Sequence, residues 1–134
     1  MANGLYTPGR EAFLDGNLDA SANDWRVILT DAADYTRNLS THNALDDVAA
    51  GGRVAVSSAL GSKAVTGGTF DAADVTWTSV TGDVSEEVIG YYHTGTESTS
   101  LLIWNMDTFA SGMPVTPNGG NISIAWNASG IFTL

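Results

Sequence analysis

Residues 15–26 come closer than any other segment to a known metal-binding pattern. Oxygen-bearing side chains recur there at alternate positions from Asp15 to Ser21, as the first ligands of a calcium-binding loop do. Such a loop also needs glycine at its sixth position and a bidentate glutamate at its twelfth. This chain has Ala20 and Arg26 at those places, so a cation stands where the ion needs a carboxylate. The segment therefore predicts a polar turn, and we expect no metal.

The residues that usually carry catalysis or bind cofactors form no recognisable motif. His42 and His93 are the two histidines, and the chain has no cysteine, so a zinc site with the usual His and Cys ligands is not expected. The sequence has no G-x-S-x-G elbow and no glycine-rich phosphate-binding loop. We predict no catalytic residues, no cofactor and hence no enzyme.

Carboxylate pairs of the glycosidase type stay possible, because the fold could bring acidic side chains together. With 15 acidic residues in the chain, some convergence is expected by chance. The four acids that could meet in this way are Glu86, Glu87, Glu97 and Asp107.

The aromatic residues could form a sugar-binding surface or fill a core. Each tryptophan lies in a run whose apolar residues alternate, which favours a place in the core or at an interface. The tyrosines are less committed and are better candidates for a protein contact. The residues in question are Trp25, Trp77, Trp104 and Trp126, and Tyr6, Tyr35 and one of Tyr91 or Tyr92.

The elements that would position these side chains are mostly strands. A short helix is predicted over residues 8–14, with Thr7 as N-cap, Pro8 in its first turn and Gly16 after its end. Beyond it the apolar period changes to two, and turn-forming residues separate short runs. This pattern predicts an all-β fold, an antiparallel β-sandwich or jelly roll. The expected strands are residues 25–30, 53–58, 75–80, 87–93, 101–106, 121–127 and 130–134.

The organisation predicted is one domain over residues 1–134, with an N-terminal arm and helix in 1–24 and a sandwich in 25–134. Residues 31–52 are polar and form a long loop excursion, with a helical turn near 44–48. Two similar hexapeptides, 31–36 and 71–76, suggest that the first aspartate of each caps a tight turn. Residues 88–92 and 101–104 are apolar on both faces, so they should lie centrally or between subunits.

Charge limits the partners. The chain has 15 acidic and 5 basic residues, a net charge of -10 and a calculated pI near 4.1. Its cations are spaced singly, so nucleic acid and anionic membrane surfaces are not expected partners. Residues 1–10 lack the pattern of a secretory signal, and no apolar run is long enough to span a membrane. A soluble protein made in the cytoplasm is expected.

Short motifs in a specific order extend along almost the whole chain. They are Tyr6 with residues 9–14, then 27–36, 74–76 with 80–83, 88–89 with 94–95, 99–103, 114–120 and 122–126. In this order they resemble a family of small virion structural proteins of tailed bacteriophages, described as head-decoration (cement) or tail-associated proteins.

The resemblance implies a non-enzymatic capsid decoration protein that binds the assembled head shell and stabilises it. Its partner would be the major capsid protein, and the chain would act as a trimer or dimer. It would be made in the cytoplasm of the bacterial host and end on the virion, at the head surface. Two alternatives stay open: a tail or tail-fibre-associated structural protein, and a carbohydrate-binding β-sandwich module. The second would expose at least two of Tyr6, Tyr35, Tyr91 and Tyr92 on one face.

Docking residues are predicted from side-chain type, because aromatic and arginine side chains are favoured as interface anchors. The alternative for each arginine is a simple ion pair with one of the abundant carboxylates. The predicted docking residues are Tyr6, Arg10, Tyr35, Arg37 and Arg53.

Overall fold

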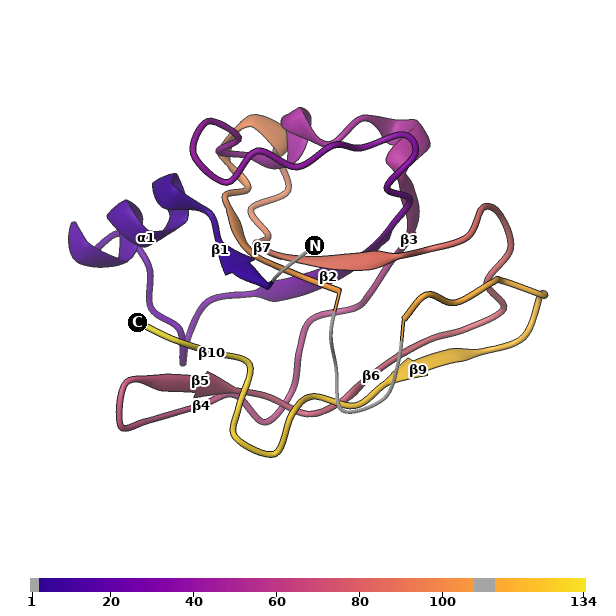
Figure 1. Ribbon diagram of the computed structural model, residues 1–134. Coiled ribbons are helices and arrows are strands. Elements are labelled where there is room, and N and C mark those ends of the chain that lie inside the picture. Colours follow the sequence, from indigo (N-terminus) through magenta and orange to yellow (C-terminus); the bar gives the residue numbers. More distant parts are fainter. Residues whose placement is uncertain (1–2, 108–112) are drawn as a thin grey trace.

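A computed structural model describes residues 3–107 and 113–134, and this part of the chain is mostly β with one short α-helix (Figure 1). The elements, in chain order, are β1 (Gly4–Leu5), α1 (Thr7–Leu14), β2 (Trp25–Thr30), the 3-10 turns η1 (Leu45–Asp47) and η2 (Ala50–Gly52), β3 (Arg53–Val56), β4 (Ala64–Thr66), β5 (Thr69–Asp71), β6 (Val75–Trp77), β7 (Glu87–Tyr92), the 3-10 turn η3 (Glu97–Thr99), β8 (Leu102–Met106), β9 (Ile122–Ile124) and β10 (Phe132–Thr133).

The described strands form three antiparallel sheets. The largest has the order β1-β8-β7-β2-β3, and the smaller ones pair β10-β5-β4 and β6-β9. Strands β2 and β7 run in register from Trp25 opposite Tyr92 to Thr30 opposite Glu87. The small sheets lie on one side of the five-stranded sheet, and residues 31–52 cross its other side (Figure 1). We call residues 31–52 the strap.

Successive side chains of the central strands point to opposite faces of the five-stranded sheet, so two separate cores form. The first core faces the small sheets and the second faces the strap. Trp25, Val27 and Leu29 of β2 point toward the small sheets, and Ile28 points toward the strap. The four tryptophans all belong to the first core, as predicted. The second core lies between the strap and the five-stranded sheet. The strap contributes Tyr35, Leu45 and Val48, and the other members are Tyr6, Ile28, Ile89, Tyr91 and Leu102.

The segments that are apolar on both faces, 88–92 and 101–104, lie in central strands, which is one of the two predicted arrangements. Strand β7 lies between β8 and β2, and β8 lies between β1 and β7. Each strand is buried on both faces by parts of the same chain. No subunit interface is needed to cover them.

Strand positions were predicted better than strand ends. The run at 25–30 is confirmed, whereas those at 75–80, 121–127 and 130–134 shorten to β6, β9 and β10. The β4–β5 hairpin and β1 were missed. Gly67 and Gly68 make the hairpin turn, with φ of 60° and 79°, a conformation that favours glycine.

The short helix is confirmed, but its cap is not the predicted one. Thr7 is already helical, and the N-cap is Tyr6, which offers no side-chain cap. Tyr6 is extended because its N–H donates to the Ile103 carbonyl, 2.9 Å away, at the edge of the sheet. Among the described residues, no helix is both long and apolar enough to cross a membrane.

The two similar hexapeptides behave differently. Asp31 caps a tight turn as predicted, because its Oδ1 accepts the Ala33 N–H at 2.8 Å and its carbonyl accepts that of Tyr35 at 3.0 Å. Asp71 instead ends strand β5, and the prediction of a second capped turn is wrong. There Asp74 accepts the Trp126 N–H at 3.0 Å. A hexapeptide this short takes its structure from its surroundings.

Candidate functional site

The two tyrosines predicted to dock a partner are core residues instead. Tyr6 is 0% exposed and Tyr35 is 3% exposed. Their hydroxyl oxygens are 2.8 Å apart, and the Tyr35 hydroxyl also lies 2.8 Å from Nδ1 of His42. Burial raises the pKa of Tyr35 to about 12 and raises the pKa of Tyr6 further. Tyr6 lies beneath the strap and Tyr35 is buried on the strap's inner side, so neither ring is accessible as an interface anchor.

The predicted arginines divide into two structural residues and one exposed residue. Arg37 donates from Nη1 to Oδ1 of Asn105 at 2.7 Å. Arg53 donates to the carbonyls of Val48 and Leu45 at 2.8 and 2.7 Å, and to Glu97 at 2.6 Å. Arg10 is exposed on α1 and forms no ion pair with any residue in 3–107 or 113–134. Of the five predicted docking residues, only Arg10 is exposed, since Arg37 and Arg53 are half-buried and both tyrosines are buried.

The roles of Arg53 and Arg10 can be separated by stability. Arg53→Met keeps the aliphatic stem but leaves two carbonyls at the end of the strap without their charged donor, so we expect a loss of about 2 kcal/mol. The ion pair between Arg53 and Glu97 adds little to the free energy of unfolding, because Glu97 is exposed. Arg10→Met should change the free energy of unfolding by less than about 0.5 kcal/mol. Urea denaturation measures both, and equal losses would contradict this division.

A buried polar cluster lies between the strap and the five-stranded sheet. Glu87 is 0% exposed and begins β7 on the face that carries Ile89 and Tyr91. Neither of its carboxyl oxygens has a hydrogen-bond partner among the described residues, and Nδ2 of Asn105 also lacks one. Burial raises the pKa of Glu87, and the neighbouring Asn105 amide and Arg37 guanidinium oppose the shift.

The sequence flagged Glu87 only as one of four acids that could converge. Asp107 and Glu86 lie near enough to raise its pKa further. Glu86 accepts the Ala32 N–H at 2.9 Å, and Glu97 is held by Arg53. A glycosidase pair needs both carboxyl groups at the substrate, whereas Glu87 is closed off from solvent. This geometry gives a carboxylate pair no support.

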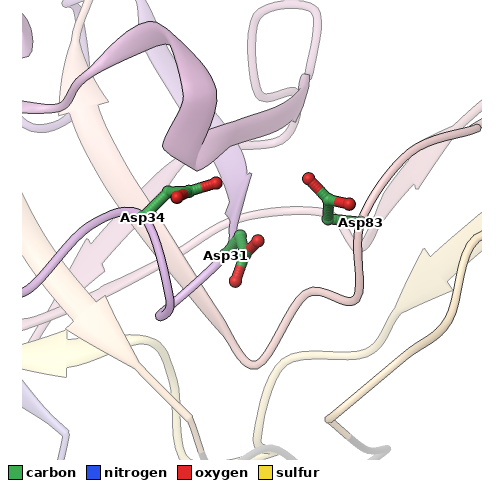
Figure 2. A group of neighbouring side chains, drawn as sticks. All are labelled: Asp31, Asp34 and Asp83. Carbon is green, nitrogen blue, oxygen red and sulfur yellow. The ribbon is translucent and has the colours of Figure 1, made fainter.

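A second acidic group gathers where the strap leaves β2 (Figure 2). One carboxylate oxygen from each of Asp31, Asp34 and Asp83 lies within 4.8 Å of the others. These are the side chains that could hold a divalent cation, since Ca²⁺ prefers carboxylate oxygens. Asp34 and Asp83 are exposed, and Asp31 already accepts the Ala33 N–H. Acidic side chains gather in this way on many surfaces without an ion, and we assign no metal to the group.

The segment that resembled a calcium loop forms the predicted polar turn before β2. Asp19 Oδ1 accepts the N–H and hydroxyl of Ser21 at 2.9 and 2.7 Å, and the N–H of Ala22 at 3.2 Å. These bonds lower the pKa of Asp19, with the Ser21 hydroxyl contributing most. The carboxylate is therefore ionised and exposed.

An apolar groove lies beside this turn, where α1, the β4–β5 hairpin and β10 meet. It has a volume of about 530 Å³, within the usual range for binding sites. Its floor is formed by Phe13, Phe70 and Phe132, and we call it the Phe groove. The centroid of the Phe132 ring lies 5.3 Å from that of Phe70 and 6.0 Å from that of Phe13. Asp19 is the charged residue that lines it.

Two of the five exposed large hydrophobic residues in the described part of the chain line the Phe groove. They are Val65, which is 51% exposed, and Leu134, which is 57% exposed. Sequence reasoning missed this surface because three of its lining residues, Val65, Gly68 and Phe70, come from the β4–β5 hairpin, which was not predicted. The Gly67-Gly68 pair between short apolar runs was the available signal.

The tyrosine face expected of a sugar-binding module is not formed. Tyr6, Tyr35 and Tyr91 are buried and Tyr92 is half-buried. Tyr92 also packs on Trp25, with ring centroids 5.6 Å apart.

No protein-family model matches the chain, and no curated protein matches it.

Proposed function

We propose that this protein is a non-enzymatic virion structural protein that decorates an assembled phage head and stabilises it. The resemblance supplies the class of protein. The layered sheets of Figure 1 support a β-sandwich scaffold. A trimer or dimer over the junctions between capsomers is the assembly that the resemblance implies.

The observation that carries a binding function is the Phe groove with its exposed apolar rim. A cluster of exposed apolar side chains around a concave surface is typical of an interaction site. The proposed occupant is a segment of the major capsid protein that presents an apolar side chain flanked by lysine or arginine. The ionised carboxylate of Asp19 at the groove and the net charge of -10 both favour such a cationic segment over a second copy of this acidic chain.

Docking of this kind would stabilise a capsid by mass action. A protein that binds the assembled lattice and not free subunits shifts the equilibrium toward the lattice. Expansion or opening of the shell would then also require breaking the added interfaces. The remaining acidic surface would face outward and discourage particles from associating with each other.

The first test is the copy number of this protein in purified particles, measured by quantitative mass spectrometry against the major capsid protein. We expect a ratio within a few-fold of one, because a decoration protein repeats with the capsid lattice. A ratio of a few hundredths would instead assign it to the tail or a tail fibre, the alternative with the same lack of chemistry. Absence from particles would contradict the virion proposal altogether.

A further inference from the structure

Glu87 is the one fully buried acid in the described part of the chain, and it lies under the strap. It stands opposite Thr30 in the register of β2 and β7. The Ser85 hydroxyl donates to the Glu87 carbonyl at 3.1 Å, whereas the carboxyl oxygens have the Asn105 amide and the Arg37 guanidinium as neighbours but no partner at hydrogen-bond geometry.

Titratable and charged groups face Glu87 from every element around it. The strap contributes Arg37 and Tyr35, with His42 bonded to the latter. The other groups are Tyr6 ahead of α1, Glu86 beside it and Asp107 after β8. Arg37 is the one cation among them, and the Nη1 bond that the structure gives it goes to Asn105.

An ionised carboxyl group is unfavourable in this position. A buried charge without hydrogen bonds costs far more free energy than a buried neutral acid. The closed structure therefore favours the protonated form, and an open form in which water reaches Glu87 favours the ionised one. For an acid of this kind, stability is fully present below the pKa of the open form and is lost as pH rises through the pKa of the closed form.

The strap is the layer that can separate. Strand β7 is bonded on both sides within the five-stranded sheet. Among the described residues, the strap makes three backbone bonds to other segments: Leu39 accepts from Thr7, Asn43 accepts from Leu102, and Leu45 donates to Ser100. Its other bonds to the rest of the chain involve side chains: Arg37 donates to Asn105, Arg53 donates to Val48, and Glu86 accepts from Ala32. Segments held by few backbone bonds open at lower free energy than the centre of a sheet.

We propose that the strap is a pH-sensitive cover, closed over the five-stranded sheet while Glu87 is protonated and released when Glu87 ionises. Release would uncover Tyr6 together with Ile28, Ile89, Tyr91 and Leu102, and would expose Tyr35 on the strap itself. This inference concerns the free protein and does not depend on the proposed virion function.

Amide hydrogen exchange between pH 5 and 9, corrected for intrinsic rates, tests the cover in the full-length protein. Each unit by which the pKa of Glu87 is higher in the closed form changes the closed-to-open ratio by up to about tenfold. We expect the protection of strap amides, relative to β2 and β7 amides, to fall by about tenfold or more as pH rises. In Glu87→Gln this dependence should disappear and the strap should stay protected. Glu11→Gln, an exposed acid on α1, is the matched control and should behave as wild type.

Three results would overturn the proposal. The first is that strap amides of the wild-type protein are equally protected at every pH. The second is a strap less protected in Glu87→Gln at neutral pH, since ionised Glu87 would then hold the strap closed by pairing with Arg37. The third is a dependence that survives in Glu87→Gln and disappears in His42→Gln. If the glutamine variant does not fold, Glu87→Met, of similar volume, gives the same comparison.

Discussion

Replacing Gly90 with alanine is expected to destabilise this protein strongly. Gly90 lies in the middle of β7, opposite Trp104 of β8. The indole of Trp104 lies across it, and an added Cβ would overlap with Cδ2, Cε2 and Cζ2 of that ring. Trp104 is 1% exposed and packs edge-on against Trp126 and near Phe70. It therefore cannot move aside without disturbing the first core.

We expect a loss of about 3 kcal/mol or more in the free energy of unfolding, at the upper end for overpacking a core. Urea denaturation of Gly90→Ala measures it. Gly61→Ala is the matched control, since an added Cβ there has no atom within 4 Å, and its change should be less than about 0.5 kcal/mol.

A double-mutant cycle identifies the cause. Trp104→Leu destabilises by itself, but Gly90→Ala should cost much less in that background because the overlapping ring is gone. Equal costs in both backgrounds would show that the glycine is needed for some reason other than its contact with the tryptophan.

The Gly90 contact also illustrates what the sequence could show of the fold. The apolar character of residues 88–92 on both faces predicted a central strand, and period two placed Trp25, Val27 and Leu29 on one face. Such patterns are local and survive in the structure. That Gly90 makes room for Trp104 depends on the register of two strands, which no single segment encodes.

The predicted docking residues show where local sequence patterns were not enough. Tyr6 and Tyr35 lie outside alternating apolar runs, a position that makes each a candidate for a protein contact. Their burial comes from the strap folding back over β7 and β8, a contact between residues far apart in sequence. A tyrosine with a polar partner such as His42 fits a core as well as it fits an interface. Side-chain type alone therefore could not decide between the two environments.

The buried polar cluster was equally hidden from the sequence. Glu87 stands directly before an apolar run, where an acid normally ends a strand at the surface. In the structure Glu87 is the first residue of β7, it pairs with Thr30 of β2, and the strap covers it. Burying an acid is unfavourable, and local propensity gives no reason to expect it. Local rules fail most often where a structure carries strain or function.

The second large effect is expected at the Phe groove. Val65 is 51% exposed on β4, so Val65→Glu should fold normally, yet it would place an acid against the apolar part of the proposed capsid segment. Loss of a contact central to an interface costs about 2 kcal/mol or more, which is about thirtyfold in affinity. The measurement is binding of the purified variant to particles that lack this protein, by co-sedimentation over a range of concentrations. Leu134→Glu, at the other exposed apolar residue that lines the groove, should have the same effect.

Val56→Glu is the matched control for that experiment. Val56 is 47% exposed on β3, an edge strand of the five-stranded sheet. Val56→Glu therefore makes the same replacement, with the same added charge, at a similarly exposed valine that does not line the groove. If Val56→Glu binds as wild type while Val65→Glu does not, the groove is the docking surface. If both variants lose affinity equally, added negative charge alone weakens binding and the groove has no special role. If neither does, the docking surface lies elsewhere, and Arg10, as the exposed residue among those predicted to dock, would be the next position to test.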